Sequence, residues 1–206
     1  GRAERLFAEV NALLTERGLM VRQGTIVDAT LIAAPPSTKN KEKARDPAMS
    51  QTKKGNQWYF GAKAHIGVDA QWGLVHTVAV TTAKVADITM TEALLHGEEE
   101  IVFGDRGYHT NARTLSSEAP KDGPRIVTPY KRKPEQELSE WQTQQNRALA
   151  ALRALVEHPF RVLKRQFGYT KVRYKGLAKN AAQMTTLFAL VNLYRARVPL
   201  LIQQER

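Results

Sequence analysis

The stretch GTIVDATLI, from Gly24 to Ile32, is rich in β-branched residues and too short for a typical helix. This composition predicts a largely buried strand. Asp28 stands inside it, and a charged carboxylate in a buried strand is costly unless it is paired or bound to a metal ion. The alternative for Asp28 alone is a carboxylate hydrogen-bonded to nearby backbone. Asp28 is therefore the first candidate site residue.

A second carboxylate ends another short apolar run. The sequence EIVFGD, residues 100–105, predicts a short buried strand that ends at Asp105, and Gly107 provides the turn after it. In open α/β sheets, the ends of the strands and the loops that follow them build binding sites. Asp105 is therefore the second candidate, although an Asp that only begins a turn has the same pattern.

Strands and helices alternate along the rest of the chain. Helices are predicted over residues 4–17, 83–96, 109–117, 138–167 and 178–198. Further strands are predicted over residues 58–68 and 74–82, which form a hairpin, and over residues 125–129. This order predicts an α/β fold in which helices flank a mixed sheet.

The length and apolar share of the chain predict one domain over residues 1–206. A leading helix falls within residues 1–20, and the C-terminal helices fall within 138–198. Residues 35–56 are polar and basic, which indicates a long loop.

The charge balance favours a polyanionic partner. Lys and Arg outnumber Asp and Glu by 31 to 20, which gives a formal net charge of +11. The alternative is a basic protein whose charges are not clustered. The chain has no cysteine, so disulfide frameworks and thiolate metal sites are excluded. No apolar run reaches membrane-spanning length, and we expect a cytoplasmic protein that makes no membrane contact.

Glu157 is the third candidate, within an otherwise basic helical segment. On a helix, Arg153, Glu157 and Lys164 share one face, because separations of four and seven residues return to nearly the same angle. The alternative is a solvated helix whose Glu makes only ion pairs with its neighbours. Pro159 complicates the prediction, because inside a helix it removes a hydrogen bond and introduces a kink.

Two strand-borne Asp residues and one helical Glu suit a pair of Mg²⁺ ions, because hard cations prefer carboxylate oxygens. Mn²⁺ is expected to substitute, since it accepts the same ligands. Two such ions support in-line phosphoryl displacement. The candidate side chains for holding DNA phosphates are Arg153, Arg161, Lys164, Arg165, Lys131, Arg132 and Lys133.

The histidine and tryptophan residues are weaker candidates for functional residues than the carboxylates. His65 and His76 fall in the predicted hairpin, where packing or surface roles are expected, and no pair of His residues has zinc-like spacing. Stacking on bases is possible for Trp58, Trp72 and Trp141, but a core or hairpin role is the preferred interpretation.

Four stretches together resemble the DDE transposases of bacterial insertion sequences. They are GTIVDAT (24–30), HIGVD (65–69), FGDRGY (103–108) and VEHPF (156–160) continuing to KRQFGY (164–169). The resemblance is to the insertion-sequence-five group, with an insertion-sequence-four-like catalytic domain, and it covers nearly the whole chain. The helical signature of that family is matched by Arg153, Glu157 and Lys164. The family signature also has a Tyr before the Arg, and the corresponding residue of this chain is Ala150.

The resemblance implies a ribonuclease-H-like fold and a metal-binding triad of Asp28, Asp105 and Glu157. It implies an enzyme that cuts and rejoins double-stranded DNA at transposon ends and target, as a homo-oligomer on DNA in the bacterial nucleoid. The helical N-terminal DNA-binding region of the family has no counterpart, so a truncated copy is expected. The alternatives are an inactive remnant that only binds nucleic acid, and a ribonuclease-H-like nuclease that cuts without joining strands.

Overall fold

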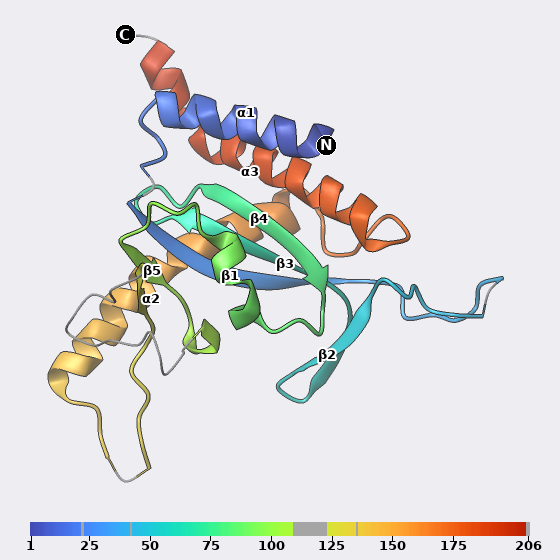
Figure 1. Ribbon diagram of the computed structural model, residues 1–206, viewed down its shortest axis with the longest axis horizontal. Coiled ribbons are helices and arrows are strands. Elements are labelled where there is room, and N and C mark those ends of the chain that lie inside the picture. The colour runs from blue at the N-terminus through green and yellow to red at the C-terminus, as the bar shows by residue number, and fades with distance from the viewer. Residues whose placement is uncertain (22, 42, 109–122, 135, 205–206) are drawn as a thin grey trace.

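The computed structural model describes residues 1–21, 23–41, 43–108, 123–134 and 136–204. At its centre is a six-stranded sheet with the order β2-β3-β1-β5-β6, and β4 pairs with β3 (Figure 1). The strands are β1 (Gly24–Ala33), β2 (Ser50–Lys54), β3 (Gln57–Asp69), β4 (Val75–Thr82), β5 (Ile101–Phe103) and β6 (Arg125–Val127). The expected mixed sheet flanked by helices is confirmed.

The sheet has an antiparallel half and a parallel half. β3 runs antiparallel to β1, β2 and β4, so the predicted hairpin of β3 and β4 is confirmed. β5 runs parallel to β1 on one side and to β6 on the other. In the parallel register, Ile26 lies opposite Phe103. This register determines which residues lie side by side where the chain continues beyond Ile26 and Phe103.

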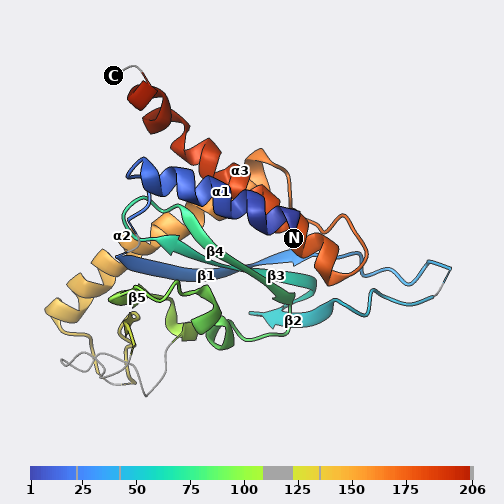
Figure 2. The ribbon, with the colours of Figure 1, turned by 45° about the horizontal axis from the view of Figure 1, so that its top comes forward.

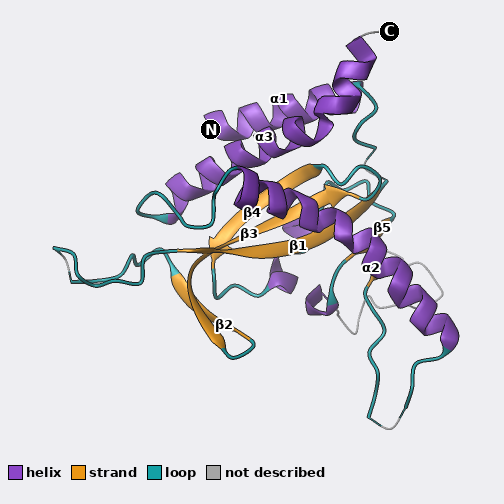
Figure 3. Ribbon diagram, turned by 180° about the vertical axis from the view of Figure 1, so that it is seen from behind, coloured by secondary structure: helices purple, strands orange, loops and turns teal. Residues whose placement is uncertain are grey.

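Helices cover one side of the sheet. α1 (Arg2–Glu16) and α3 (Leu177–Gln204) lie side by side over it, and α2 (Glu140–Arg161) runs across β1 (Figures 2 and 3). Ile26 belongs to the large core under these helices, whereas Val27 belongs to a smaller cluster with Val102 and Tyr108. Successive strand residues point to opposite faces, so β1 contributes to both cores.

The prediction of one helix over residues 83–96 is wrong. The segment instead forms two short 3₁₀ helices, η1 (Asp87–Met90) and η2 (Glu92–Leu94). The hydroxyl of Thr89 donates to the Ala86 carbonyl, and that of Thr91 donates to the Ile88 carbonyl. These bonds compete with a regular α-helical ladder, because they bind carbonyls only three residues back.

The basic loop predicted over residues 35–56 is too long, because its last part forms β2. Both faces of β2 are at least partly exposed, and its residues are all polar. The strand therefore lacks the alternation of apolar and polar residues from which strands are predicted. Gly55, with φ of +61°, forms a tight turn with Asn56 and joins Lys54 to Gln57. The hairpin of β2 and β3 projects from the sheet (Figure 1).

The helical segment predicted over residues 138–167 is observed as α2 and a π-helical turn, over 140–166, and the later helix is longer than predicted. Ser139 and Gln142 form a capping box at the start of α2. The helix continues through Pro159 and then widens into the π-helical segment η4 (Val162–Gln166). Widening of this kind accommodates an interrupted hydrogen-bond ladder. α3 extends beyond the predicted 178–198.

The short helix predicted over residues 109–117 lies outside the described residues. None of the helices that the structure describes is both long and apolar enough to cross a membrane.

A buried amide joins α3 to β4. The Asn192 side chain accepts from the Val75 N–H at 2.8 Å and donates to the Val75 carbonyl at 2.6 Å. Its Nδ2 also donates to Asn11 on α1, at 2.9 Å. Asn192 therefore serves as the hydrogen-bond partner that a further strand would otherwise provide.

Replacing this amide tests its role in holding the helices on the sheet. Asn192→Ala should lower the free energy of unfolding by about 2–3 kcal/mol, because it leaves buried backbone groups of Val75 without partners. Urea unfolding followed by circular dichroism measures the change. Lys179→Ala, at an exposed position of α3, is the control and should change stability little. An unchanged unfolding midpoint for Asn192→Ala would contradict this role.

Candidate active site

A cavity of about 470 Å³ opens beside β1, where that strand continues past the end of β5. Its walls include three carboxylates, Asp28, Asp87 and Asp105. Four lysines complete the charged lining: Lys53, Lys54, Lys63 and Lys164. The structure therefore brings two of the three predicted site carboxylates to one cavity with basic walls.

Strand register explains how Asp28 and Asp105 come together. Ile26 lies opposite Phe103 in parallel strands, so two further residues bring Asp28 and Asp105 to the same level. Asp28 lies within β1 and accepts from the Ala29 N–H at 2.8 Å. Asp105 follows β5 and accepts from the Gly107 N–H at 2.7 Å.

The turn after β5 allows little change around Asp105. A side chain at Gly104 would place its Cβ 2.8 Å from the Cβ of Tyr108, so this position has room only for glycine. The Tyr108 N–H donates to the Asp105 carbonyl, and the Arg106 guanidinium donates to the Tyr130 carbonyl. These contacts explain the sequence GDRGY as a turn that holds one carboxylate.

Burial and like charge act together on Asp28. Burial is the largest cause that raises the pKa of Asp28, and the Asp105 and Asp87 carboxylates add to it; against the Ala29 hydrogen bond and the Arg153 charge, the net pKa is about 6. The pKa of Tyr108 is also raised, first by burial and then by the same three carboxylates. The carboxylates thus share one electrostatic environment.

Asp87 and Lys63 were not identified from the sequence. Lys63 Nζ lies 2.8 Å from Asp87 Oδ1 and 2.7 Å from the Val85 carbonyl. His65 Nδ1 lies 3.7 Å from the same Asp87 oxygen, yet burial lowers the pKa of His65 to about 4, so its ring is neutral near pH 7. Lys63 is a charge inside a largely buried strand, and the criterion that identified Asp28 would have identified it.

Glu157 occupies a different position from the two Asp residues. Its side chain is exposed on α2, and within the described part of the chain it is not among the residues that line the cavity. Arg153, one turn earlier, acts electrostatically on Asp28. Lys164, beyond the end of α2, donates from Nζ to the Thr30 hydroxyl at 2.7 Å. Residues on both sides of Glu157 therefore reach β1.

The predicted DNA-binding residues fall into two groups. Arg161, Lys164 and Arg165 line a second cavity of about 600 Å³, and Lys164 also lines the carboxylate cavity. Burial and the nearby Lys54 lower the pKa of Lys164. The run from Lys131 to Lys133 is exposed between β6 and α2, where Arg132 pairs with Glu137.

All three tryptophans have substantial exposure, so none has a core role, whereas the alternative of a hairpin role is confirmed for Trp58 on β3 and for Trp72 in the turn between β3 and β4. Trp58 on the β2–β3 hairpin is 64% exposed, and Lys53 Nζ lies 6.0 Å from the centre of its ring. Because β2 also contributes Lys53 and Lys54 to the cavity wall, the hairpin extends the basic surface away from the carboxylates.

Comparison with known proteins gives one family. The family described as the transposase DDE domain matches residues 20–193 of this chain. No solved structure matches the chain.

The raised pKa of Asp28 predicts how stability depends on pH. Folding favours the protonated form, so the contribution of Asp28 is fully present below its ordinary pKa of 3.8 and is lost as pH rises through about 6. In metal-free buffer, Asp28→Asn should stabilise the protein at about pH 8 by roughly 1–2 kcal/mol, allowing for partial exposure.

Chemical unfolding of both proteins at about pH 8 and about pH 4 measures this difference. The gain should disappear at the lower pH, where Asp28 is largely neutral in the wild type. Glu16→Gln, at an exposed position of α1 outside the cavity, is the control for a general charge effect. A gain of equal size at both pH values would show that charge burial at position 28 is not its cause.

Proposed function

This chain belongs to the family of transposase DDE domains, and from that membership we propose that it is a metal-dependent DNA nuclease and strand transferase. The proposed activity serves the transposition of a bacterial insertion sequence of the insertion-sequence-five group. The observation that carries the proposal is that Asp28 and Asp105 line one cavity whose other charged residues are mainly lysines.

Divalent metal fits this cavity by its donors and its electrostatics. Asp28 and Asp105, joined by Glu157 from α2, would hold Mg²⁺ or Mn²⁺ through carboxylate oxygens. A cation would relieve the burial and like-charge repulsion that raise the pKa of Asp28. Bound divalent ions make a water or 3′-hydroxyl more acidic and balance charge on the leaving oxygen.

Asp87 has a different role in this proposal. Its Oδ1 is already paired with Lys63 at 2.8 Å, so much of its charge is compensated within the chain. Glu157 has no such partner among the ion pairs of the described residues, and its carboxylate is exposed on α2. We therefore assign Glu157 as the third ligand, and Asp87 as a residue that positions Lys63.

The basic residues would bind and orient the DNA backbone. The bond from Lys164 to Thr30 holds its ammonium at the cavity wall, where a phosphate could approach. Arg161 and Arg165 continue this positive surface along the second cavity. The proposed substrates are double-stranded transposon ends and target DNA, bound by a homo-oligomer in the bacterial nucleoid.

A cleavage assay on a transposon-end duplex with Mg²⁺ tests the catalytic assignment. Asp105→Asn and Glu157→Gln should each reduce the cleavage rate by at least about 100-fold, because each removes charge from the metal-binding group. Glu140→Gln, at the start of the same helix as Glu157, is the matched control and should cleave normally. Joining of a pre-cleaved end to target DNA distinguishes a strand transferase from a simple nuclease.

Two outcomes would change the assignment. Cleavage by Asp105→Asn at the wild-type rate would overturn the proposed active site. If Glu157→Gln remained active while Asp87→Asn did not, Asp87 would replace Glu157 as the third ligand.

Salt dependence of DNA binding tests the role of Lys164. Lys164→Ala should weaken binding to every duplex sequence and reduce the slope of log affinity against log salt concentration by about 1. Fluorescence anisotropy over a salt series measures both quantities. Arg2→Ala, an exposed basic residue of α1, should leave the slope unchanged, and equal slopes for wild type and Lys164→Ala would contradict the contact.

A further inference from the structure

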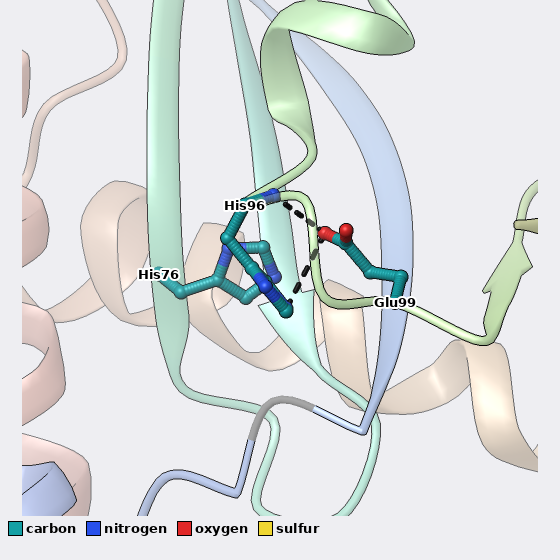
Figure 4. Close-up of side chains that lie close together, drawn as sticks. All are labelled: His76, His96 and Glu99. Atoms are coloured by element: carbon teal, nitrogen blue, oxygen red, sulfur yellow. Dashed lines mark hydrogen bonds and ion pairs between the residues drawn. The ribbon is translucent and has the colours of Figure 1, made fainter. Parts of the chain in front are cut away.

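A second cluster of metal-ligating side chains lies at the other end of the parallel strands from Asp28 and Asp105. His76 on β4 meets His96 and Glu99, which stand in the connection before β5 (Figure 4). One ligand atom from each lies within 4.8 Å of the other two, and the described residues contain no other such group. Two separate stretches of the sequence, one on β4 and one directly before β5, therefore converge here.

Three distances within the cluster match a small tetrahedral site, and the ligand atoms of the two histidines and Glu99 all lie within 4.8 Å of one another. His96 Nε2 lies 3.3 Å from Glu99 Oε1. The Thr25 hydroxyl lies 3.0 Å from His76 Nε2 and 3.2 Å from Glu99 Oε1. A tetrahedral ion with bonds of about 2.0–2.1 Å places neighbouring ligand atoms roughly 3.3 Å apart. Little movement is therefore needed to bring these atoms around one ion.

An ion pair alone leaves part of the cluster unsatisfied. His96 Nε2 is buried and has no hydrogen-bond partner within the described part of the chain, although Glu99 Oε1 is nearby. A buried polar atom without a hydrogen bond destabilises the folded state. A bound cation would use the lone pair of this nitrogen and compensate the charge of the Glu99 side chain, which is only 1% exposed.

Surrounding contacts already orient the ligands. Glu99 Oε1 accepts from the His96 N–H at 2.6 Å, and Oε2 accepts from the Gly97 N–H at 2.8 Å. His76 Nδ1 lies 2.9 Å from the Thr77 hydroxyl, and an Nδ1–H donated to it would present Nε2 as the ligand. Such outer contacts fix the tautomer and direction of metal ligands.

Two glycines allow this arrangement. A Cβ at Gly67 on β3 would lie 2.7 Å from His76 Cε1, so the histidine ring occupies the space that a side chain there would fill. Gly97 has φ of +93°, a conformation that favours glycine, and this lets its N–H turn toward Glu99.

We propose that His76, His96 and Glu99 bind one divalent transition-metal ion, with the Thr25 hydroxyl at the fourth corner. Zinc suits two imidazole nitrogens and one carboxylate, whereas Mg²⁺ prefers a shell of oxygens. With the ion on Nε2, the single N–H proton of the neutral His96 ring would lie on Nδ1. The long 3.3 Å bond that Nδ1 accepts from the Glu98 N–H is therefore lost.

The site has a structural consequence for the carboxylate cavity. It ties β4 and β1 to the residues directly before β5, and β5 spans only Ile101–Phe103 before the chain reaches Asp105. Thr25 and Asp28 are three residues apart on β1, which corresponds to about 10 Å. The ion would therefore fix the start of the strand that carries Asp105, without entering the chemistry there.

Cobalt titration of the chelator-treated full chain tests the proposal. One equivalent of Co²⁺ should give the intense visible absorption of a tetrahedral ion, and one equivalent of Zn²⁺ should remove it. His96→Asn should abolish the band, whereas His158→Asn, at an exposed position of α2, should keep it. Zn²⁺ should also raise the melting temperature of the wild type by at least about 4 °C, and that of His96→Asn by much less.

The Asp28→Asn, Asp105→Asn double variant separates this site from the catalytic cavity. It should keep the cobalt band, because neither carboxylate belongs to the cluster. Loss of the band in this double variant, an unchanged band in His96→Asn, or no stoichiometric band in the wild type would each overturn the proposal. If His96→Asn fails to fold, the wild-type band and its zinc-dependent melting temperature still decide the question.

Discussion

The parallel register of β1 and β5 is the constraint on which the rest of the site depends. Ile26 opposite Phe103 brings Asp28 and Asp105 to one level, although 77 positions separate them in the sequence. A register shift of one residue would turn one carboxylate to the opposite face of the sheet. The buried side chains of Ile26 and Val102, in the two cores, oppose such a shift.

This arrangement concentrates negative charge where β1 passes the carboxyl end of β5. Burial and the neighbouring carboxylates raise the pKa of Asp28, while Lys63 and Arg153 compensate only part of the charge. The free energy that offsets this unfavourable charge must therefore come from the rest of the fold. The packing of the helices contributes to it, and so does the Asn192 amide that joins α3 to β4. Perturbed pKa values of this kind are typical of functional sites.

The sequence alone predicted the parts of the fold that have strong local patterns. The β-branched run around Asp28 and the β3–β4 hairpin are confirmed, because alternation or burial is visible in each. The polar strand β2 and the 3₁₀ turns around Asp87 were missed, because hydrogen bonds rather than apolar periodicity define them. Lys63 was missed although it is, like Asp28, a charge inside a largely buried strand; its pairing with Asp87, 24 positions away, could not be predicted from local patterns.

The two clusters differ in ligand chemistry in a way that separates their roles. Oxygen donors beside lysines suit a hard cation and a phosphate, which both exchange with solvent. Imidazole donors enclosed by Thr25 and Gly67 suit an ion that stays bound. Since Glu99 and Asp105 flank the same three-residue strand, an ion held at its start would limit how far its end can move. The proposed ion at the start of β5 would thus support the position of the carboxylate that follows its end.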